Sequence, residues 1–266
     1  MLNKALRRLP KADIQALRFK QDKLRQPTSQ IPSFIRSSQS SSPSIAEAAS
    51  ATLLFVWSGS STAFCISQSG LILTCAHCIA ESANEYDPKV ERWLLFSNGD
   101  PVRAKPLVWD AQRDLALLQI TVAPAHLEDT PFPYIRLAAE PPKLRTSLLC
   151  IGNPGAENLE TDQEGVATNF DILHISEGRF RGLDKSQDVQ DNSEIGALKH
   201  DCWTYWGHSG APLLDAKNGS LLGCHSSWDD ETGMRRGVAW EAIRAFLTQH
   251  CEEQPPSGSV DDPVIL

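Results

Sequence analysis

Short apolar runs separated by polar turns dominate the chain between residues 52 and 225. Runs of about four to eight residues, rich in β-branched and aromatic side chains, are typical of strands. The dipeptide Asn218-Gly219 lies between Pro212–Leu214 and Leu221–Gly223 and predicts a hairpin turn, since both turn residues tolerate a positive φ. The pattern predicts further strands at Thr52–Trp57, Thr62–Ile66, Leu71–Thr74, Trp93–Phe96, Leu115–Ile120, Leu148–Ile151, Phe170–Ser176 and Leu221–His225.

The composition fits one folded domain with charged ends. The chain has 266 residues, of which 41% are apolar, and this suffices to bury a sizeable core. No apolar run approaches about 18 residues, so the sequence predicts no membrane span. Residues 1–46 carry nine Lys or Arg and two acids, a net charge of +7, whereas the remainder carries −15.

The basic N-terminal segment has several interpretations. Residues 1–25 have the pattern of a basic amphipathic helix interrupted at Pro10, and residues 26–50, rich in Ser, Pro and Gln, predict a flexible linker. The segment fits a mitochondrial transit peptide, or a basic arm that is ordered or binds a partner, and both alternatives stay open. Nucleic-acid binding is disfavoured, because only Phe19 and Phe34 interrupt the basic residues.

The seven cysteines favour an intracellular protein with reduced thiols. Their number is odd, and the first residues are too charged for a secretory signal. Several cysteines lie inside apolar runs, where a free thiol behaves as a small hydrophobe. We therefore expect a cytoplasmic or nuclear location, with the mitochondrion as the alternative.

Ser209 has the local sequence of a nucleophile on a tight turn. It is flanked by Gly207 and Gly210 and enters an apolar run. Glycines let the backbone bend sharply and bring amides close to a reacting carbonyl. A serine needs a base to remove its proton, and that base needs a third group to orient it.

His77 and Asp114 supply the two missing groups. Histidine has a pKa near neutrality, and a buried aspartate can fix its tautomer. Taken singly, His77 also fits a core or surface histidine, and Asp114 a turn or cap residue. Together with Ser209, in the chain order His, Asp, Ser, the three contexts favour a catalytic triad.

A zinc site at Cys75, His77 and Cys78 is the competing interpretation of the same segment. Structural zinc sites pair such a motif with a second one, and no second pair lies at a suitable spacing. Core packing and catalysis explain these residues better, so we expect no metal and no cofactor.

These motifs resemble the trypsin-like serine peptidase superfamily, and its HtrA/Deg-like branch more than the digestive trypsins. The resemblance covers about 51–248 and departs from the branch at His208, where Asn or Asp is usual, and at Ala211, where Gly is usual. An alanine fits this position only if its φ is negative. The resemblance is carried by the segments Ser61–Thr74, Cys150–Gly155, His200–Leu214, Leu222–His225 and Gly237–Ile243.

This resemblance implies an all-β fold of two six-stranded antiparallel barrels with a short C-terminal helix. It divides the chain into the arm and linker 1–50, a protease domain 51–250, and a disordered acidic tail 251–266. Barrel one then spans about 51–130 and barrel two about 140–250. No PDZ-like domain is expected after the protease domain, and the oligomeric state is not predicted.

The resemblance also implies roles for individual residues. His77, Asp114 and Ser209 form the triad of a serine endopeptidase that acts on polypeptides. The amides of Gly207 and Ser209, with the His208 peptide between them, form the oxyanion hole. Ser226 supports the aspartate, and the segment Ser226–Trp228 pairs with extended substrate by strand addition.

The residue preference has two competing predictions. Trp203 and Thr204 stand six and five residues before Ser209, and His225 follows on the next strand. The Thr204/His225 pair resembles glutamyl endopeptidases and picornavirus-type main proteases, in which it holds a Glu or Gln side chain. The alternative is that Trp203 fills the pocket and leaves a preference for small apolar residues. Substrate contacts are thus expected from Trp203, Thr204, His225, Ser226 and Ser227.

A catalytically silent module used for protein binding is the rival function, and a latent enzyme is another. The presence of all three triad residues argues against silence. No acidic residue directly precedes Ser209 to pair with a newly freed N-terminus, because His208 occupies that place.

Overall fold

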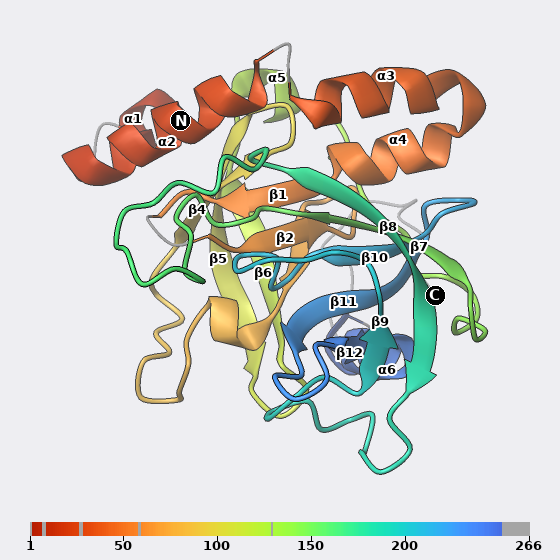
Figure 1. Ribbon diagram of the computed structural model, residues 1–266. Coiled ribbons are helices and arrows are strands. Elements are labelled where there is room, and N and C mark those ends of the chain that lie inside the picture. The colour runs from red at the N-terminus through yellow and green to blue at the C-terminus, as the bar shows by residue number, and fades with distance from the viewer. Residues whose placement is uncertain (1, 7–8, 27–28, 58–59, 129, 252–266) are drawn as a thin grey trace.

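Two closed antiparallel barrels make up the body of the protein (Figure 1). The computed structural model describes residues 2–6, 9–26, 29–57, 60–128 and 130–251. Barrel one has the strand order β1-β2-β3-β6-β5-β4. Its strands are β1 (Thr52–Phe55), β2 (Thr62–Cys65), β3 (Leu71–Thr74), β4 (Arg92–Phe96), β5 (Pro101–Asp110) and β6 (Leu115–Val122).

Barrel two repeats this topology. Its strands follow the order β7-β8-β9-β12-β11-β10, and β10 closes the barrel by pairing with β7. The helix α6 (Trp240–Cys251) follows directly, so the predicted double barrel with a C-terminal helix is confirmed. The strands are β7 (Ser147–Gly152), β8 (His174–Leu183), β9 (Leu198–His200), β10 (Pro212–Asp215), β11 (Leu221–Trp228) and β12 (Arg235–Ala239).

Three strands differ from the sequence prediction for identifiable reasons. The strand β5 was not predicted, because Pro101 and Pro106 lie in it and proline cannot donate to a ladder. A register shift follows Pro106, which accommodates the missing donor. The strand β9 has only three residues, and β8 begins at His174 rather than at the predicted Phe170.

The predicted hairpin turn is present between β10 and β11. Gly219 has φ +73°, and its amide donates to Asp215 O at 2.8 Å. A Cβ on Gly219 would lie 2.7 Å from Ser44 O. Glycine is therefore required by the backbone angle and by the close approach of a helical segment.

The N-terminal segment is helical, which corrects the linker prediction for its described residues. The helices are α1 (Leu2–Leu6), α2 (Lys11–Leu24), α3 (Gln30–Ser41) and α4 (Pro43–Ser50). Figure 1 shows them together along one side of the barrels, above β1. The break at Pro10 between α1 and α2 agrees with the sequence prediction. The tail at 252–266 lies outside the described residues.

Helical spacing of a few apolar residues explains this difference. Ile31 is fully buried against the barrels although its neighbours in sequence are Ser, Gln and Pro, and Ala49 is fully buried in the alanine-rich α4. The segment thus has few large apolar side chains, but those it has lie on the helix faces that contact the barrels. The low average hydrophobicity of residues 26–50 led to the linker prediction, whereas the helical spacing of their apolar residues decides the structure.

Polar contacts add to the docking of α2 on barrel one. Lys20 Nζ donates to Phe55 O at 2.8 Å and to Trp57 O at 3.0 Å. Burial lowers the pKa of Lys20 to about 8. Gln21 Nε2 donates to Gly99 O at 2.7 Å. None of the helices in the described part of the chain has the length and hydropathy needed to cross a membrane.

The docking of α3 can be tested by stability. Replacing Ile31 with Ala removes a fully buried side chain, so we expect the free energy of unfolding to fall by about 2–4 kcal/mol. The matched change Ser33→Ala, on the exposed side of the same helix, should alter it by less than about 0.5 kcal/mol. Denaturant unfolding measures both values. Equal, negligible effects would show that α3 does not pack on the barrels.

Candidate active site

The turn that carries Ser209 is fixed by hydrogen bonds within itself. Ser209 precedes β10, and both flanking glycines have positive φ, +97° at Gly207 and +83° at Gly210. The amide of His208 donates to Tyr205 O at 3.0 Å, and the Tyr205 amide donates to His208 Nδ1 at 3.1 Å. Ala211 has a negative φ, which meets the condition set by its sequence.

Thr62 on β2 holds the same turn from the other barrel. Its hydroxyl donates to Gly207 O at 2.9 Å, and its amide donates to Ser209 O at 2.9 Å. The hydroxyl also accepts from the Asn153 amide at 2.9 Å. Sequence reasoning missed Thr62, because a threonine in a strand carries no signal for such a role.

His77 and Asp114 meet at the rim of barrel one. His77 lies in the short helix η1 (Ala76–Cys78), and Asp114 ends the turn before β6. The Asp114 carboxylate oxygens lie 2.9 and 3.0 Å from His77 Nδ1. One of them also accepts from the His77 amide at 3.1 Å.

Ser226 on β11 completes the environment of this carboxylate. Its hydroxyl donates to Asp114 Oδ2 at 2.6 Å. Asp114 is 6% exposed and has φ +52°, an angle that aspartate tolerates better than most residues. Three donors therefore fix the position of a buried carboxylate.

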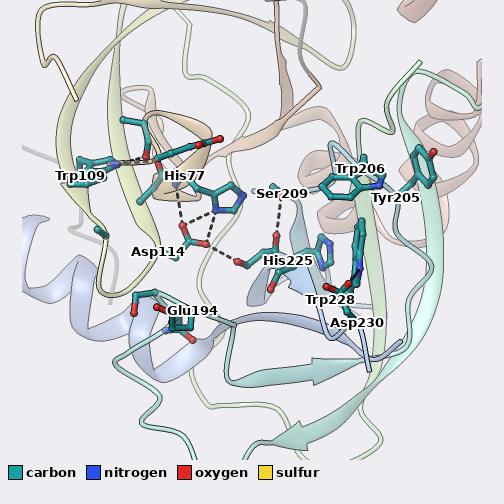
Figure 2. Close-up of a pocket in the computed structure, with 18 residues that line it drawn as sticks. His77, Trp109, Asp114, Glu194, Tyr205, Trp206, Ser209, His225, Trp228 and Asp230 are labelled. Atoms are coloured by element: carbon teal, nitrogen blue, oxygen red, sulfur yellow. Dashed lines mark hydrogen bonds and ion pairs between the residues drawn. The ribbon is translucent and has the colours of Figure 1, made fainter. Parts of the chain in front are cut away.

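The electrostatics of His77 follow from these neighbours. Burial lowers the pKa of His77, but Cys78 and the Asp114 carboxylate raise it more, so the net direction is upward. The side chain is 42% exposed, and in Figure 2 its ring extends from Asp114 toward Ser209. The site thus stabilises the protonated form of the His77 imidazole.

The Ser209 hydroxyl bonds to the backbone of the neighbouring strand. Its Oγ donates to Ser226 O at 2.9 Å. Figure 2 shows Ser209 facing the His77 ring, with Asp114 behind that ring. The structure thus brings the three sequence-predicted residues together at one end of a cavity.

Two amides at the turn have no hydrogen-bond acceptor among the described residues. Within the described part of the chain, the N–H groups of Gly207 and Ser209 donate to no protein atom, whereas the His208 amide between them is used by Tyr205 O. Buried or half-buried amides without partners are uncommon in folded proteins. They are available to an anionic oxygen placed beside Ser209.

His208 is a neutral, buried side chain. Burial lowers its pKa to about 3, and its Nε2 has no hydrogen-bond partner among the described residues. A Cβ at Gly152 would lie 2.4 Å from His208 Cδ2, so this glycine makes room for the imidazole. No charge is therefore present in the position directly before Ser209.

A cavity of about 590 Å³ opens between the two barrels beside these residues (Figure 2). The cavity is bordered by His225, Ser226 and Ser227. It is also bordered by Trp206 and Trp228, whose rings meet edge to face with their centroids 4.5 Å apart. Three acidic residues, Glu81, Glu194 and Asp230, also border the cavity.

Trp203 and Thr204 do not border this cavity. The Trp203 ring packs in an aromatic cluster with Phe170 at 4.9 Å and His174 at 4.7 Å. The Thr204 hydroxyl is buried and has no hydrogen-bond partner in the described structure. Of the five expected substrate contacts, the structure brings His225, Ser226 and Ser227 to the cavity.

His225 is linked to a second buried histidine. Its Nδ1 lies 3.0 Å from His200 Nε2, which sequence reasoning did not assign to the site. Burial is the main cause that lowers the pKa of His225, and it lowers that of His200 to about 3. The cavity is thus bordered by a neutral imidazole whose Nδ1 is already engaged.

Comparison with known proteins assigns the family. A family model described as a trypsin-like peptidase domain matches residues 61–223, which is more than half of the chain. The chain belongs to the trypsin-like peptidase family. A protein of this family with this double barrel is a serine-type endopeptidase. No curated protein sequence matches the chain.

Solved structures support the fold of this peptidase. The active form of the Rv3671c protease from M. tuberculosis is 19% identical, with TM-score 0.55, over 83% of this chain and 89% of that one. The serine endoprotease from Yersinia pestis is 18% identical, with TM-score 0.54, over 77% and 64%. At these identities the likeness extends to the fold alone.

The contact between the serine turn and barrel one predicts a position-specific cost. A Cβ at Gly210 would lie 2.1 Å from Thr62 O and 2.4 Å from Thr74 Oγ1. We expect Gly210→Ala to lower the free energy of unfolding by more than about 3 kcal/mol, because backbone atoms of both barrels must shift.

Gly233→Ala is the matched control. Gly233 also has a positive φ, +68°, but its Cβ would meet nothing within 4 Å. Its cost should be the backbone strain alone, about 1–2 kcal/mol. Denaturant unfolding of both variants gives the difference. Equal costs would contradict the tight contact between the barrels.

Proposed function

We propose that this peptidase cleaves peptide bonds through an acyl-enzyme on Ser209, with His77 as general base and Asp114 as its orienting partner. The observation that carries the proposal is the Asp114 carboxylate, which lies 2.9 Å from His77 Nδ1. In the neutral imidazole, this contact places the proton on Nδ1, toward Asp114, and leaves Nε2 unprotonated on the cavity side.

Attack begins with a rotation of the Ser209 hydroxyl. Turning the side chain about χ1 moves Oγ from Ser226 O toward His77 Nε2, which then takes the proton. Catalytic hydrogen bonds are often looser in free enzymes than in complexes with substrate. The positive charge formed on the imidazole is stabilised by the buried Asp114 carboxylate, which Ser226 holds in place.

The unpartnered amides of Gly207 and Ser209 form the oxyanion hole in this proposal. A tetrahedral intermediate places an oxyanion beside the attacked carbon, and two N–H donors would bind it. One such donor contributes about 10²–10³ in turnover in other enzymes. The His208 amide between them donates to Tyr205 O and serves the turn instead.

Covalent labelling tests the nucleophile. A fluorophosphonate probe should label the wild type and the Ser227→Ala variant but not Ser209→Ala, because only Ser209 has a base in position. Ser227 is a suitable control, since it borders the same cavity and its hydroxyl has no partner among the described residues. No labelling of the folded wild type would support a silent or latent binding module, and equal labelling of folded Ser209→Ala would show that Ser209 is not the nucleophile.

For the residue before the cleaved bond, we propose a preference for Gln. His225 borders the cavity and is kept neutral by burial, so it suits a carboxamide better than a carboxylate. The acids Glu81, Glu194 and Asp230 around the same cavity disfavour a negative side chain. Of the two side chains that the sequence predicts before the cleaved bond, Gln and Glu, these two observations favour Gln.

Either tautomer of the His200–His225 pair leaves one hydrogen-bonding nitrogen for substrate. If His200 Nε2 donates, His225 Nε2 carries a proton for the carboxamide oxygen. If His225 Nδ1 donates, its Nε2 accepts from the carboxamide nitrogen. A Gln side chain fits both arrangements because it carries a donor and an acceptor.

A peptide library measures this preference. We expect Gln to be enriched over Glu and over Ala in the wild type. In His225→Val, the enrichment of Gln over Ala should fall at least about tenfold, because a hydrogen bond is lost at similar volume. The change His126→Gln, on α5 (Ala125–Glu128) and away from the cavity, should leave it unchanged. A wild type that prefers small apolar residues would overturn the proposal in favour of the HtrA-like alternative.

A further inference from the structure

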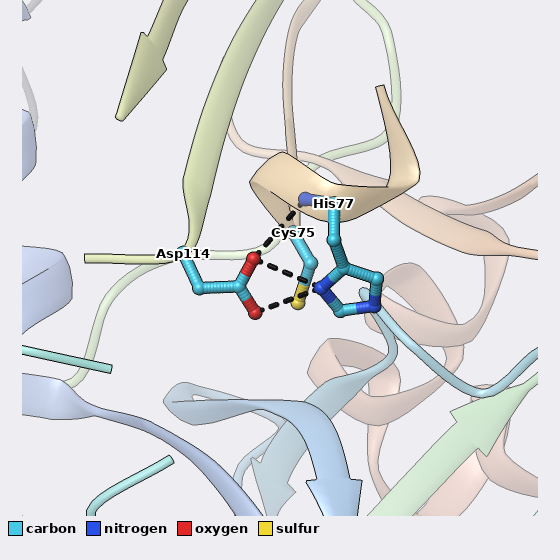
Figure 3. A group of neighbouring side chains, drawn as sticks. All are labelled: Cys75, His77 and Asp114. Atoms are coloured by element: carbon cyan, nitrogen blue, oxygen red, sulfur yellow. Dashed lines mark hydrogen bonds and ion pairs between the residues drawn. The ribbon is translucent and has the colours of Figure 1, made fainter. Parts of the chain in front are cut away.

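A buried thiol lies beside the His77–Asp114 pair. The Cys75 sulfur, a ring nitrogen of His77 and a carboxylate oxygen of Asp114 all lie within 4.8 Å of one another. Figure 3 shows the sulfur between the Asp114 carboxylate and the His77 ring. The proposed reaction uses two of these side chains and gives no role to the third.

The three donors match the ligand preferences of zinc. A thiolate, an imidazole and a carboxylate are its usual protein ligands, and sulfur disfavours Mg²⁺ and Ca²⁺. Zinc with three protein ligands keeps an open fourth position for water. The cavity is bordered by His77 and Asp114 but not by the fully buried Cys75, so an ion would enter from the side of His77 and Asp114.

Small shifts of the three ligand atoms would bring the distances between them to those of a zinc site. Tetrahedral zinc bonds of about 2.0–2.3 Å place ligand atoms about 3.3–3.6 Å apart. His77 Nδ1 and Asp114 Oδ1 are already 2.9 Å apart, so an ion entering between them requires a separation of a few tenths of an ångström. The sulfur must approach by about 1 Å, and it then exchanges its contacts with Cys224 Sγ at 3.9 Å and His225 O at 3.4 Å for the bond to the ion.

We propose that Zn²⁺ binds Cys75, His77 and Asp114 and reversibly inhibits the peptidase. This regulation rests on the proposed catalytic roles of His77 and Asp114. It extends the sequence-based comparison of zinc with catalysis, because the structure adds Asp114 as the ligand that the Cys75-His77-Cys78 motif lacked. Cys78 also lies beside this group, because its thiol interacts with His77 and Cys75, and its sulfur lies 3.5 Å from Ser209 O.

Zinc binding and catalysis exclude each other, because they require the proton of the His77 ring on different nitrogens. When zinc takes Nδ1, the ring proton moves to Nε2, and the Cys75 thiol releases its own proton to solvent. A protonated Nε2 cannot accept the proton of Ser209, and Asp114 no longer orients the ring. Chelation of the metal reverses each of these changes without breaking a covalent bond.

Activity and metal binding are measured on the same full-length protein. We expect Zn²⁺ to inhibit peptide cleavage at one ion per chain, and EDTA to restore activity. In Cys75→Ala, the zinc concentration for half inhibition should rise at least about 100-fold, since a direct ligand matters more than a residue behind one. The matched variant Cys202→Ala, at another fully buried cysteine, should behave as the wild type.

Cobalt gives a readout that needs no activity. Co²⁺ added to the wild type should produce thiolate-to-metal charge-transfer absorption with tetrahedral d–d bands, and Cys75→Ala should lack the thiolate band. Cys75→Ser provides a second variant, because its hydroxyl can keep the hydrogen bond that the thiol makes with His225 O.

The outcomes separate the two proposals. Zinc inhibition of the same strength in Cys75→Ala and Cys75→Ser, or the absence of the thiolate band in the wild type, overturns the zinc site. A thiolate band in protein that shows no labelling dependent on Ser209 keeps the metal site and overturns the catalytic proposal instead.

Discussion

The carboxylate of Asp114 connects the two barrels at the point where the proposed chemistry occurs. It belongs to barrel one, accepts from the backbone and ring of His77, and also accepts from Ser226 of barrel two. A buried carboxylate without such donors would be strongly destabilised. Its hydrogen bonds therefore fix the relative placement of η1, the turn before β6, and β11.

Thr62 makes the reciprocal connection. It belongs to barrel one and holds the Gly207–Ser209 turn of barrel two through its hydroxyl and its amide. Neither barrel thus contains a complete site, because each fixes a functional segment of the other. This interdependence explains why close glycine contacts, such as that of Gly210 with Thr62, occur at the junction. His208, which lies in the same turn directly before Ser209, is neutral, so the shape of the turn needs no ion pair.

Much of the fold could be predicted from the sequence, because alternating apolar runs and turn residues are local signals. The strands β1, β2 and β3 appear close to their expected bounds. The strand β5 could not be predicted, since its prolines are tolerated only through a bulge in the folded barrel. The helices α3 and α4 were missed because their large apolar side chains are few and are buried only by tertiary contact.

The sequence also placed His77, Asp114 and Ser209 as candidates, and the structure brings them together. It could not show that Cys75 lies beside the His77–Asp114 pair, that His200 contacts His225, or that Thr62 holds the serine turn. These contacts join residues far apart in the chain, and no local spacing encodes them. Trp203 illustrates the opposite case, because its spacing suggested a pocket residue and its ring packs in an aromatic cluster.

The most direct test of the central claim is the turnover number of Asp114→Asn on a peptide that the wild type cleaves. Asparagine keeps the size and tolerates the backbone angle, but its amide nitrogen faces His77 Nδ1 and favours the wrong tautomer. We expect a kcat about 10⁴-fold lower, with near-UV circular dichroism of the folded protein unchanged. A variant that retains kcat within about tenfold of the wild type would contradict the role of this carboxylate.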